Sequence, residues 1–130
     1  MRFLLDTNAI IGVLKGNEGL IAKLKQYQPT DFGMPSIVSH ELAFGAYNSQ
    51  RVEQNLQIVD ALQFDVLEFS KSDAHAAGEI RAALKKQGTP IGPYDVLIAG
   101  QAVARSLILV TNNMKEFKRV QGLSVEDWLS

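Results

Sequence analysis

The chain contains no cysteine, which excludes both disulfide bridges and thiolate metal sites. It also lacks any apolar run that approaches the roughly 20 residues needed to cross a bilayer. Asp6 follows Arg2 too closely for a secretory signal, which needs an extended apolar segment after its basic start. We therefore expect a cytoplasmic protein without a membrane segment.

The chain also has little net charge and few histidines. The 13 basic and 14 acidic side chains leave a formal net charge of −1. This balance gives no overall attraction to nucleic acid or to an anionic membrane, although a local patch can still bind RNA. His40 and His75 are too few and wrongly placed for a histidine-rich transition-metal site. We interpret His40 as a structural or solvated side chain.

What the chain does contain is enough apolar material for a sizeable core. Hydrophobic residues make up 46% of its 130 residues, and we expect one domain over residues 1–130. Short apolar runs of strand length alternate with segments of helical spacing, and there is no internal repeat or linker. This alternation predicts an α/β fold, with helices flanking a mostly parallel sheet.

The element boundaries follow from these patterns. Strands are predicted at 3–5, 32–34, 64–69 and 107–110, with a final strand or tail at 124–129. Helices are predicted at 8–14, 20–27, 37–47, 52–62, 72–86, 93–104 and 114–118. We expect Ser36 to cap one helix, Gly88 to end another and Pro93 to start the next. Val66 is expected on the buried side of a half-buried strand, and the small residues of 93–104 predict close helix packing.

Four polar positions stand where predicted strands end or predicted helices begin. Asp6 and Asn113 each follow an apolar strand, and Glu41 and Asp95 lie early in helices. Ligands of open α/β sheets bind beyond the carboxyl ends of the strands, so these side chains can share one edge. Converging carboxylates repel one another unless a cation or hydrogen bonds compensate. Hard cations such as Mg²⁺ prefer oxygen ligands and use one or two carboxylates beside several waters.

Each acid also has an ordinary structural explanation. Asp6 can satisfy backbone amides at the start of a helix, and for this residue alone the two interpretations are equally good. Glu41 can be a solvated helix residue. Asp95 can be a first-turn acid that the helix dipole favours. However, Asp95 lies within an otherwise apolar segment, which favours a functional role.

Four motifs follow one another along the chain: Leu4-Leu5-Asp6-Thr7-Asn8, Ser36-Ile37-x-x-x-Glu41-Leu42-x-x-Gly45, Gly92-Pro93-Tyr94-Asp95-x-x-Ile98-Ala99 and Val110-Thr111-Asn112-Asn113-x-x-Glu116-Phe117. In this order they resemble the PIN-domain family and, within it, the VapC toxins of bacterial toxin–antitoxin pairs. The segment Ile80-Arg81-Ala82-x-Leu84 and the ending Glu126-Asp127-Trp128 are similar to the enteric VapC branch. The resemblance spans nearly the whole chain.

The resemblance implies a PIN-like three-layer α/β/α sandwich with an acidic pocket that binds Mg²⁺ or Mn²⁺. Asp6 and Asp95 correspond to the main metal-binding carboxylates, and Glu41 to a third acid that reaches the metal directly or through water. Asn113 stands where many members carry a fourth acid, and its amide brings no charge for a second tightly bound metal. The catalytic prediction is therefore Asp6, Glu41, Asp95 and Asn113, with Glu79 and Arg81 left outside the site.

The implied function is that of a metal-dependent, site-specific endoribonuclease toxin. Its expected substrate is tRNA, with the initiator tRNA anticodon loop as the first candidate, and hydrolysis would leave a 5′-phosphate and a 3′-hydroxyl. Expected partners are a VapB-like antitoxin and a second copy of the chain in a homodimer and a higher toxin–antitoxin complex. DNA would be recognised only through the antitoxin. For Arg81, contact with substrate phosphate, with a partner or with solvent all remain open.

Other classes of protein fit the sequence less well. The main alternative is a non-catalytic, partner-binding PIN-like module with a vestigial acidic pocket. A haloacid-dehalogenase-type phosphatase needs a second Asp where this chain has Asn8. A response-regulator receiver domain needs paired acids after the first strand, where Leu5 precedes Asp6.

Overall fold

The computed structural model describes residues 1–129, which form a five-stranded sheet in the order β3-β2-β1-β4-β5. The strands are β1 (Phe3–Leu5), β2 (Phe32–Pro35), β3 (Asp65–Leu67), β4 (Ile108–Val110) and β5 (Val125–Glu126). All four neighbouring pairs are parallel, and Phe3 pairs with Phe32 on one side and with Ile108 on the other. The predicted α/β class with a mostly parallel sheet is confirmed.

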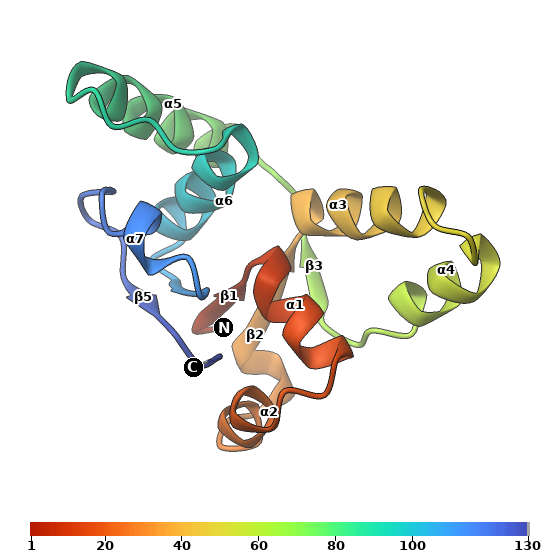
Figure 1. The fold of residues 1–130 in the computed structure, drawn as a ribbon. Coiled ribbons are helices and arrows are strands. Elements are labelled where there is room, and N and C mark those ends of the chain that lie inside the picture. Colours follow the sequence, from red (N-terminus) through yellow and green to blue (C-terminus); the bar gives the residue numbers. More distant parts are fainter. Residues whose placement is uncertain (130) are drawn as a thin grey trace.

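Helices occupy the connections between the strands. They are α1 (Thr7–Leu14), α2 (Glu18–Leu24), the 3-10 turn η1 (Pro29–Asp31), α3 (Ser36–Tyr47), α4 (Val52–Asp60), α5 (Lys71–Lys86), α6 (Pro93–Ala104) and α7 (Met114–Phe117). In Figure 1 the α3–α4 and α5–α6 pairs extend from opposite sides of the sheet, and α1 lies between them. This arrangement frames the edge of the sheet at which the strands end.

The core is centred on β1, whose three residues are all buried. A continuous apolar run of this kind is typical of a parallel strand that is covered on both faces. The edge strand β3 differs, because Val66 is 51% exposed. The expectation that Val66 faces the core is wrong: β3 pairs with β2 alone, and it packs against the core through Leu67 instead.

Helices α5 and α6 pack more closely than any ordinary side chain would allow. A Cβ atom added at Gly100 would lie 2.5 Å from the Cβ of Ala77. This confirms the prediction that the small residues of α6 lie against a neighbour. Gly88 ends α5 as predicted, with a φ of 71° that glycine adopts without steric cost.

An ion pair joins the start of α5 to the end of α6. Arg105 Nη2 lies 2.9 Å from the buried Asp73 Oδ2, and Ser70 N donates to the same carboxyl at 2.8 Å. Burial raises the pKa of Asp73, but the hydrogen bonds from Arg105 and Ser70 outweigh it and hold this pKa below its ordinary value. The helix pair is therefore fixed at this end by charge as well as by packing.

Several element ends differ from the prediction. Ser36 is the first residue of α3 and makes no capping hydrogen bond, because Pro35 occupies the cap position. Helix α2 ends at Leu24, so Tyr27 lies outside the helix. There its ring contacts Phe3 and Trp128, with centroids 4.7 and 5.8 Å away. Beyond the end of α2, Tyr27 is therefore held by aromatic contacts with the core.

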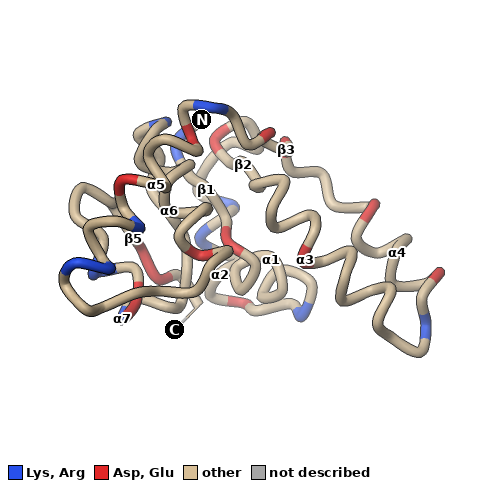
Figure 2. The backbone as a smooth tube through the Cα atoms, turned by 90° about the horizontal axis from the view of Figure 1, so that it is seen from above, with Lys and Arg blue, Asp and Glu red and all other residues tan. Residues whose placement is uncertain are grey.

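Charged residues are spread over the elements rather than collected on one of them, as Figure 2 shows along the backbone. Among residues 1–129, no helix is both long and apolar enough to cross a membrane.

Candidate functional site

The predicted site lies where two neighbouring strands of the sheet end side by side. β1 and β4 are adjacent, and the connections leaving them run to opposite halves of the sheet. Such a switch point opens a crevice at the carboxyl ends of the strands. Asp6 follows β1, and its backbone N donates to Val110 O of β4 at 3.2 Å. The residues after each strand are thereby brought together.

Asp6 is both a helix cap and a buried acid. Its Oδ1 accepts a hydrogen bond from Ala9 N at 2.9 Å at the start of α1, and the residue is only 3% exposed. Burial is the main cause that raises the pKa of Asp6 to about 6, and the charges of Asp95 and Glu41 act in the same direction. Hydrogen bonds from Thr111 and Ala9 oppose this rise. The structural and functional interpretations of Asp6 are thus compatible.

Asp95 and Glu41 reach the same region from two helices. Burial, followed by the charges of Glu116 and Glu41, raises the pKa of Asp95. Glu41 Oε1 accepts a hydrogen bond from the Thr7 hydroxyl at 3.0 Å, which ties α3 to the start of α1. The three predicted acids therefore act on one another, as expected for carboxylates that converge.

Glu116 is a fourth acid that the sequence analysis leaves out of the site. Asn113 Nδ2 donates to Glu116 Oε2 at 3.0 Å, and Asn113 N donates to the Thr111 hydroxyl at 2.9 Å. Asn113 therefore lies beside an acid that it holds by a hydrogen bond. The available signal was the spacing of three residues from Asn113 to Glu116, which brings both to one face of a helix start.

Two aromatic residues directly precede two of the acids in the sequence and contact each other. The rings of His40 and Tyr94 meet edge to face, with centroids 5.6 Å apart at 62°. Both residues are exposed, and each directly precedes one of the acids Glu41 and Asp95 in the sequence. The exposed His40 fits the solvated one of its two predicted interpretations, and it also contacts a ring from another helix.

The donor set suits a hard cation held by few protein ligands. Among residues 1–129, no group of three His, Cys, Asp or Glu side chains could by itself hold a metal. Mg²⁺ does not require one, because it keeps several waters beside one or two carboxylates. Asp6 and Asp95 are two carboxylates whose pKa values rise partly through nearby negative charge, a repulsion that a cation would relieve. The residues therefore fit Mg²⁺ coordinated by two acids and water.

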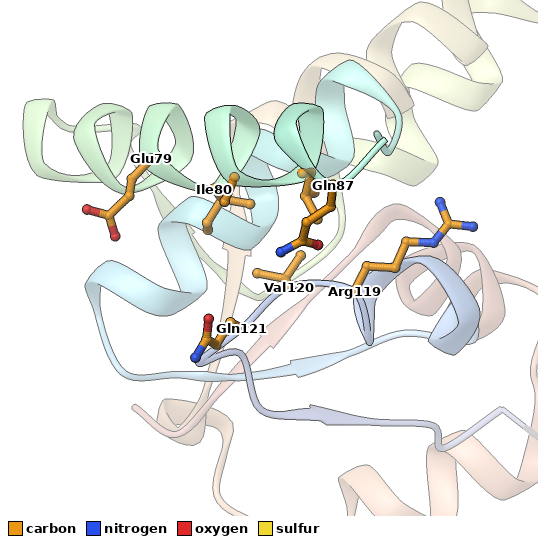
Figure 3. Close-up of a pocket in the computed structure, with 8 residues that line it drawn as sticks. Glu79, Ile80, Gln87, Arg119, Val120 and Gln121 are labelled. Carbon is orange, nitrogen blue, oxygen red and sulfur yellow. The ribbon is translucent and has the colours of Figure 1, made fainter. Parts of the chain in front are cut away.

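Glu79 and Arg81 are not among the residues that act on these acids. Glu79 lines a cavity of about 240 Å³ together with Arg119 and Gln87. Figure 3 shows Glu79 and Arg119 at opposite ends of this cavity. Arg81 lines a different groove on α5. Neither residue is among the groups that shift the pKa of Asp6 or Asp95.

Comparison with known proteins identifies the family. The PIN domain model matches residues 3–123. The tRNA(fMet)-specific endonuclease VapC of Shigella flexneri is 40% identical, over 98% of both chains. The crystal structure of DNA-bound VapBC from Salmonella typhimurium superposes with a TM-score of 0.93 and 38% identity, over 98% of both chains. VapBC2 from Rickettsia felis, bound to a promoter DNA fragment, has a TM-score of 0.91 and 34% identity, over 98% of this chain and 99% of its own.

This chain belongs to the PIN domain family. The resemblance inferred from four short motifs is confirmed, and so is the fold that it implied.

Proposed function

We propose that this protein is the ribonuclease toxin of a toxin–antitoxin pair and that its activity depends on Mg²⁺. The observation that carries the proposal is the mutual action of Asp6, Glu41 and Asp95 at one edge of the sheet. Burial is the main cause that raises the pKa values of Asp6 and Asp95, and the charge of Glu41 adds to both rises. Acids whose pKa values are shifted by burial and by specific charged neighbours are typical of functional sites. The names of the relatives, endonuclease and VapBC, support an RNA-cleaving role.

Asp6 and Asp95 would hold Mg²⁺, which activates a water and stabilises charge on the attacked phosphate when bound. Thr7 fixes Glu41 through Oε1, and Oε2 remains to accept a hydrogen bond from the attacking water. Asn113 holds Glu116 beside Asp95 and brings no charge of its own. Hydrolysis would then leave a 5′-phosphate and a 3′-hydroxyl.

The proposed substrate is tRNA, with the anticodon loop of the initiator tRNA first among candidates. The Shigella flexneri relative is named for tRNA(fMet). The exposed Tyr94 ring next to Asp95 supports an unpaired region, because bases that are free of a duplex stack on aromatic side chains. Such a substrate would place the enzyme in the bacterial cytoplasm.

The proposed protein partner is a VapB-like antitoxin, because the similar structures are VapBC complexes. A groove of about 240 Å³ between α1, α3 and α4, here called the Glu41 groove, supports this assignment. Exposed apolar residues Leu14 and Ile58 line one part of it, and Thr7 and Glu41 line another. A segment seated there would cover an acid of the site. We also propose a homodimer within a larger complex, with DNA bound through the antitoxin.

The test is cleavage of initiator tRNA compared with elongator methionine tRNA, with Mg²⁺ and with EDTA. We expect two discrete fragments from the initiator tRNA with Mg²⁺ and none with EDTA. Asp6→Asn and Asp95→Asn should each lower the rate by at least about 100-fold, since both remove a metal ligand. Asp65→Asn, on the exposed edge strand, is the matched control and should cleave like the wild type.

A second measurement separates the metal from the activity. Mg²⁺ that binds only the folded chain stabilises it, by about 1.4 kcal/mol at ten times its Kd, and this stabilisation raises Tm. This increase should occur in the wild type and in Asp65→Asn, but not in Asp6→Asn. Cleavage in EDTA, or an Asp95→Asn protein with the wild-type rate, would contradict the proposal. A folded chain that binds its antitoxin and cuts no RNA would favour the non-catalytic module.

A further inference from the structure

A second groove opens between α5 and the loop that leads into α6. It has a volume of about 430 Å³ and is lined by Arg81 and Lys85 of α5 and by Pro90, Ile91 and Pro93 of the loop and the start of α6. We call it the Arg81 groove. The α5–α6 pair that carries it borders the sheet on the side opposite α3 and α4 (Figure 1).

Arg81 and Lys85 present two positive charges on one helix face. They are four residues apart, so their side chains leave α5 in nearly the same direction. Both residues are exposed, and no carboxylate within residues 1–129 forms an ion pair with either of them. The guanidinium and the ammonium are therefore available to an anion that enters the groove.

The lining of the Arg81 groove includes the start of the helix that carries Asp95. Pro93 is the first residue of α6 and Asp95 is the third. A Cβ atom added at Gly92 would lie only 3.3 Å from Asp95 Oδ2, so the loop passes directly beside this carboxylate. Arg119, just beyond α7, donates from Nη1 to Pro90 O at 3.1 Å and braces the loop. The loop and the first turn of α6 thus connect the groove to Asp95.

The acids cannot attract a nucleic acid by themselves. No Lys or Arg is among the groups that act on Asp6 or Asp95, and the net charge of the chain is −1. A polyanion that approaches these carboxylates is repelled, and phosphate neutralisation by cations supplies most of the affinity for nucleic acid. Apart from the proposed Mg²⁺, which acts at the scissile phosphate alone, the cations must therefore come from a surface next to the acids.

We propose that the Arg81 groove binds the backbone phosphates of the RNA strand beside the scissile bond, with Arg81 and Lys85 as the phosphate ligands. This inference rests on the proposed ribonuclease function, because it assigns a path to the same substrate. Arg81 forms a fork that can hold two phosphate oxygens, and Lys85 acts as a point charge. The apolar wall of Pro90 and Ile91 gives the sugars an uncharged surface.

The experiment measures binding separately from cleavage. A fluorescein-labelled, unstructured oligouridylate is titrated in EDTA with wild type, Arg81→Ala/Lys85→Ala and Lys86→Ala, from about 50 to about 200 mM salt. Lys86 is the matched control, because it is an exposed cation on α5 that does not line the groove. Thermal melts should coincide for all three proteins, since exposed substitutions change stability little.

We expect the double variant to bind about tenfold more weakly, equivalent to about 1.4 kcal/mol. Its slope of log K against log salt should be smaller by about 1.4, because each lost phosphate contact on a single strand removes about 0.7. Lys86→Ala should leave both quantities unchanged. A double variant with the slope and affinity of Lys86→Ala would overturn the proposal, and so would a wild type that binds no RNA.

Failure of the groove proposal can be distinguished from failure of the proposed ribonuclease function. Groove-dependent binding without cleavage in Mg²⁺ would retain the groove and reject the nuclease. Cleavage with an unchanged KM in the double variant would retain the nuclease and reject the groove. A double variant that binds RNA normally but changes from dimer to monomer in light scattering would assign the groove to contact between copies of the chain, which also overturns the proposal.

Discussion

Asp6 combines two demands that oppose each other at neutral pH. Its carboxyl caps α1 through Ala9 N, and it is buried beside other acids. An Asp that caps a helix is stabilising, whereas a charge that is buried near like charges is not. The burial of Asp6 beside like charges therefore costs stability at neutral pH, which the proposed metal site would explain.

The pKa of about 6 for Asp6 predicts how stability depends on pH. The unfolded chain releases this proton near pH 4 and the folded chain near pH 6, so the folded state binds more protons between these values. Stability therefore falls as pH rises from about 4 to about 6, by roughly 3 kcal/mol for a shift of about two units. The elevated pKa of Asp95 acts in the same direction.

Asp6→Asn should remove the part of this pH dependence that comes from Asp6. The amide oxygen still caps α1, while the buried charge is gone. We expect the variant to be about 1–3 kcal/mol more stable than wild type at pH 7 and nearly equal at pH 4. Urea denaturation in EDTA at both pH values is the measurement, with Asp65→Asn as the exposed control. A variant that is less stable at pH 7, with an unchanged m-value, would show that the buried charge does not oppose folding.

For individual residues, the sequence predicts the acids of the site better than it predicts which other residues act on them. Asp6 and Asp95 can be predicted because one follows an apolar strand and the other sits in an apolar segment. Glu116 could not be chosen in the same way, since an acid in a first helical turn is also an ordinary surface residue. Only the folded chain brings it close enough to Asp95 to raise the pKa of that residue.

Among the elements, α5 and α6 depend most on small residues at their contact. Gly100 faces the backbone of Ala77, which lies only 2.6 Å from an added Cβ and cannot rotate away as a side chain could. Gly78 lies on α5 with nothing within 4 Å. Packing therefore requires a glycine at position 100, whereas it leaves room for a larger side chain at position 78.

Gly100→Ala should destabilise the protein by about 1–3 kcal/mol, because the helices must separate to admit the methyl group. Gly78→Ala should stabilise it by about 0.5–1 kcal/mol, because alanine favours the helix and meets no neighbour. Urea denaturation of both variants measures the difference. If both substitutions changed the free energy of unfolding in the same direction, helix propensity rather than packing would govern this pair.

The types of the helices and strands could be predicted from the local sequence pattern. Some helix ends and the buried face of β3 could not. Helix α7 and the stop at Gly88 were predicted correctly, because both depend on local residues. The Ser36 cap was wrong, since Pro35 takes the cap position. The burial of Val66 was wrong because alternation alone does not reveal which strand lies at the edge.

For the whole molecule, the strand order could not be read from the sequence. The order β3-β2-β1-β4-β5 depends on pairings between distant segments, such as Phe3 with Ile108. What could be predicted is that the carboxyl ends of parallel strands share one edge, which is why the acids of separate motifs meet. The Glu41 and Arg81 grooves are products of that assembly, because each is lined by residues from separate elements.

The two grooves suggest a division of surface around the acids, with RNA on the α5 side and the antitoxin on the α1, α3 and α4 side. Ile58 is 44% exposed in the Glu41 groove, whereas Val66 is 51% exposed outside it. Ile58→Asp should weaken inhibition by a co-expressed VapB-like antitoxin at least about tenfold, because a charge would be buried against an apolar partner.

Val66→Asp is the matched control and should leave inhibition unchanged. Both variants should cleave RNA at the wild-type rate when the antitoxin is absent, since neither residue is one of the site acids. Titrating the antitoxin into the cleavage reaction measures the inhibition constant of each protein. If Ile58→Asp were inhibited as strongly as wild type, the antitoxin would have to reach the acids by another surface. Competition with RNA at the Arg81 groove would then be the next explanation to test.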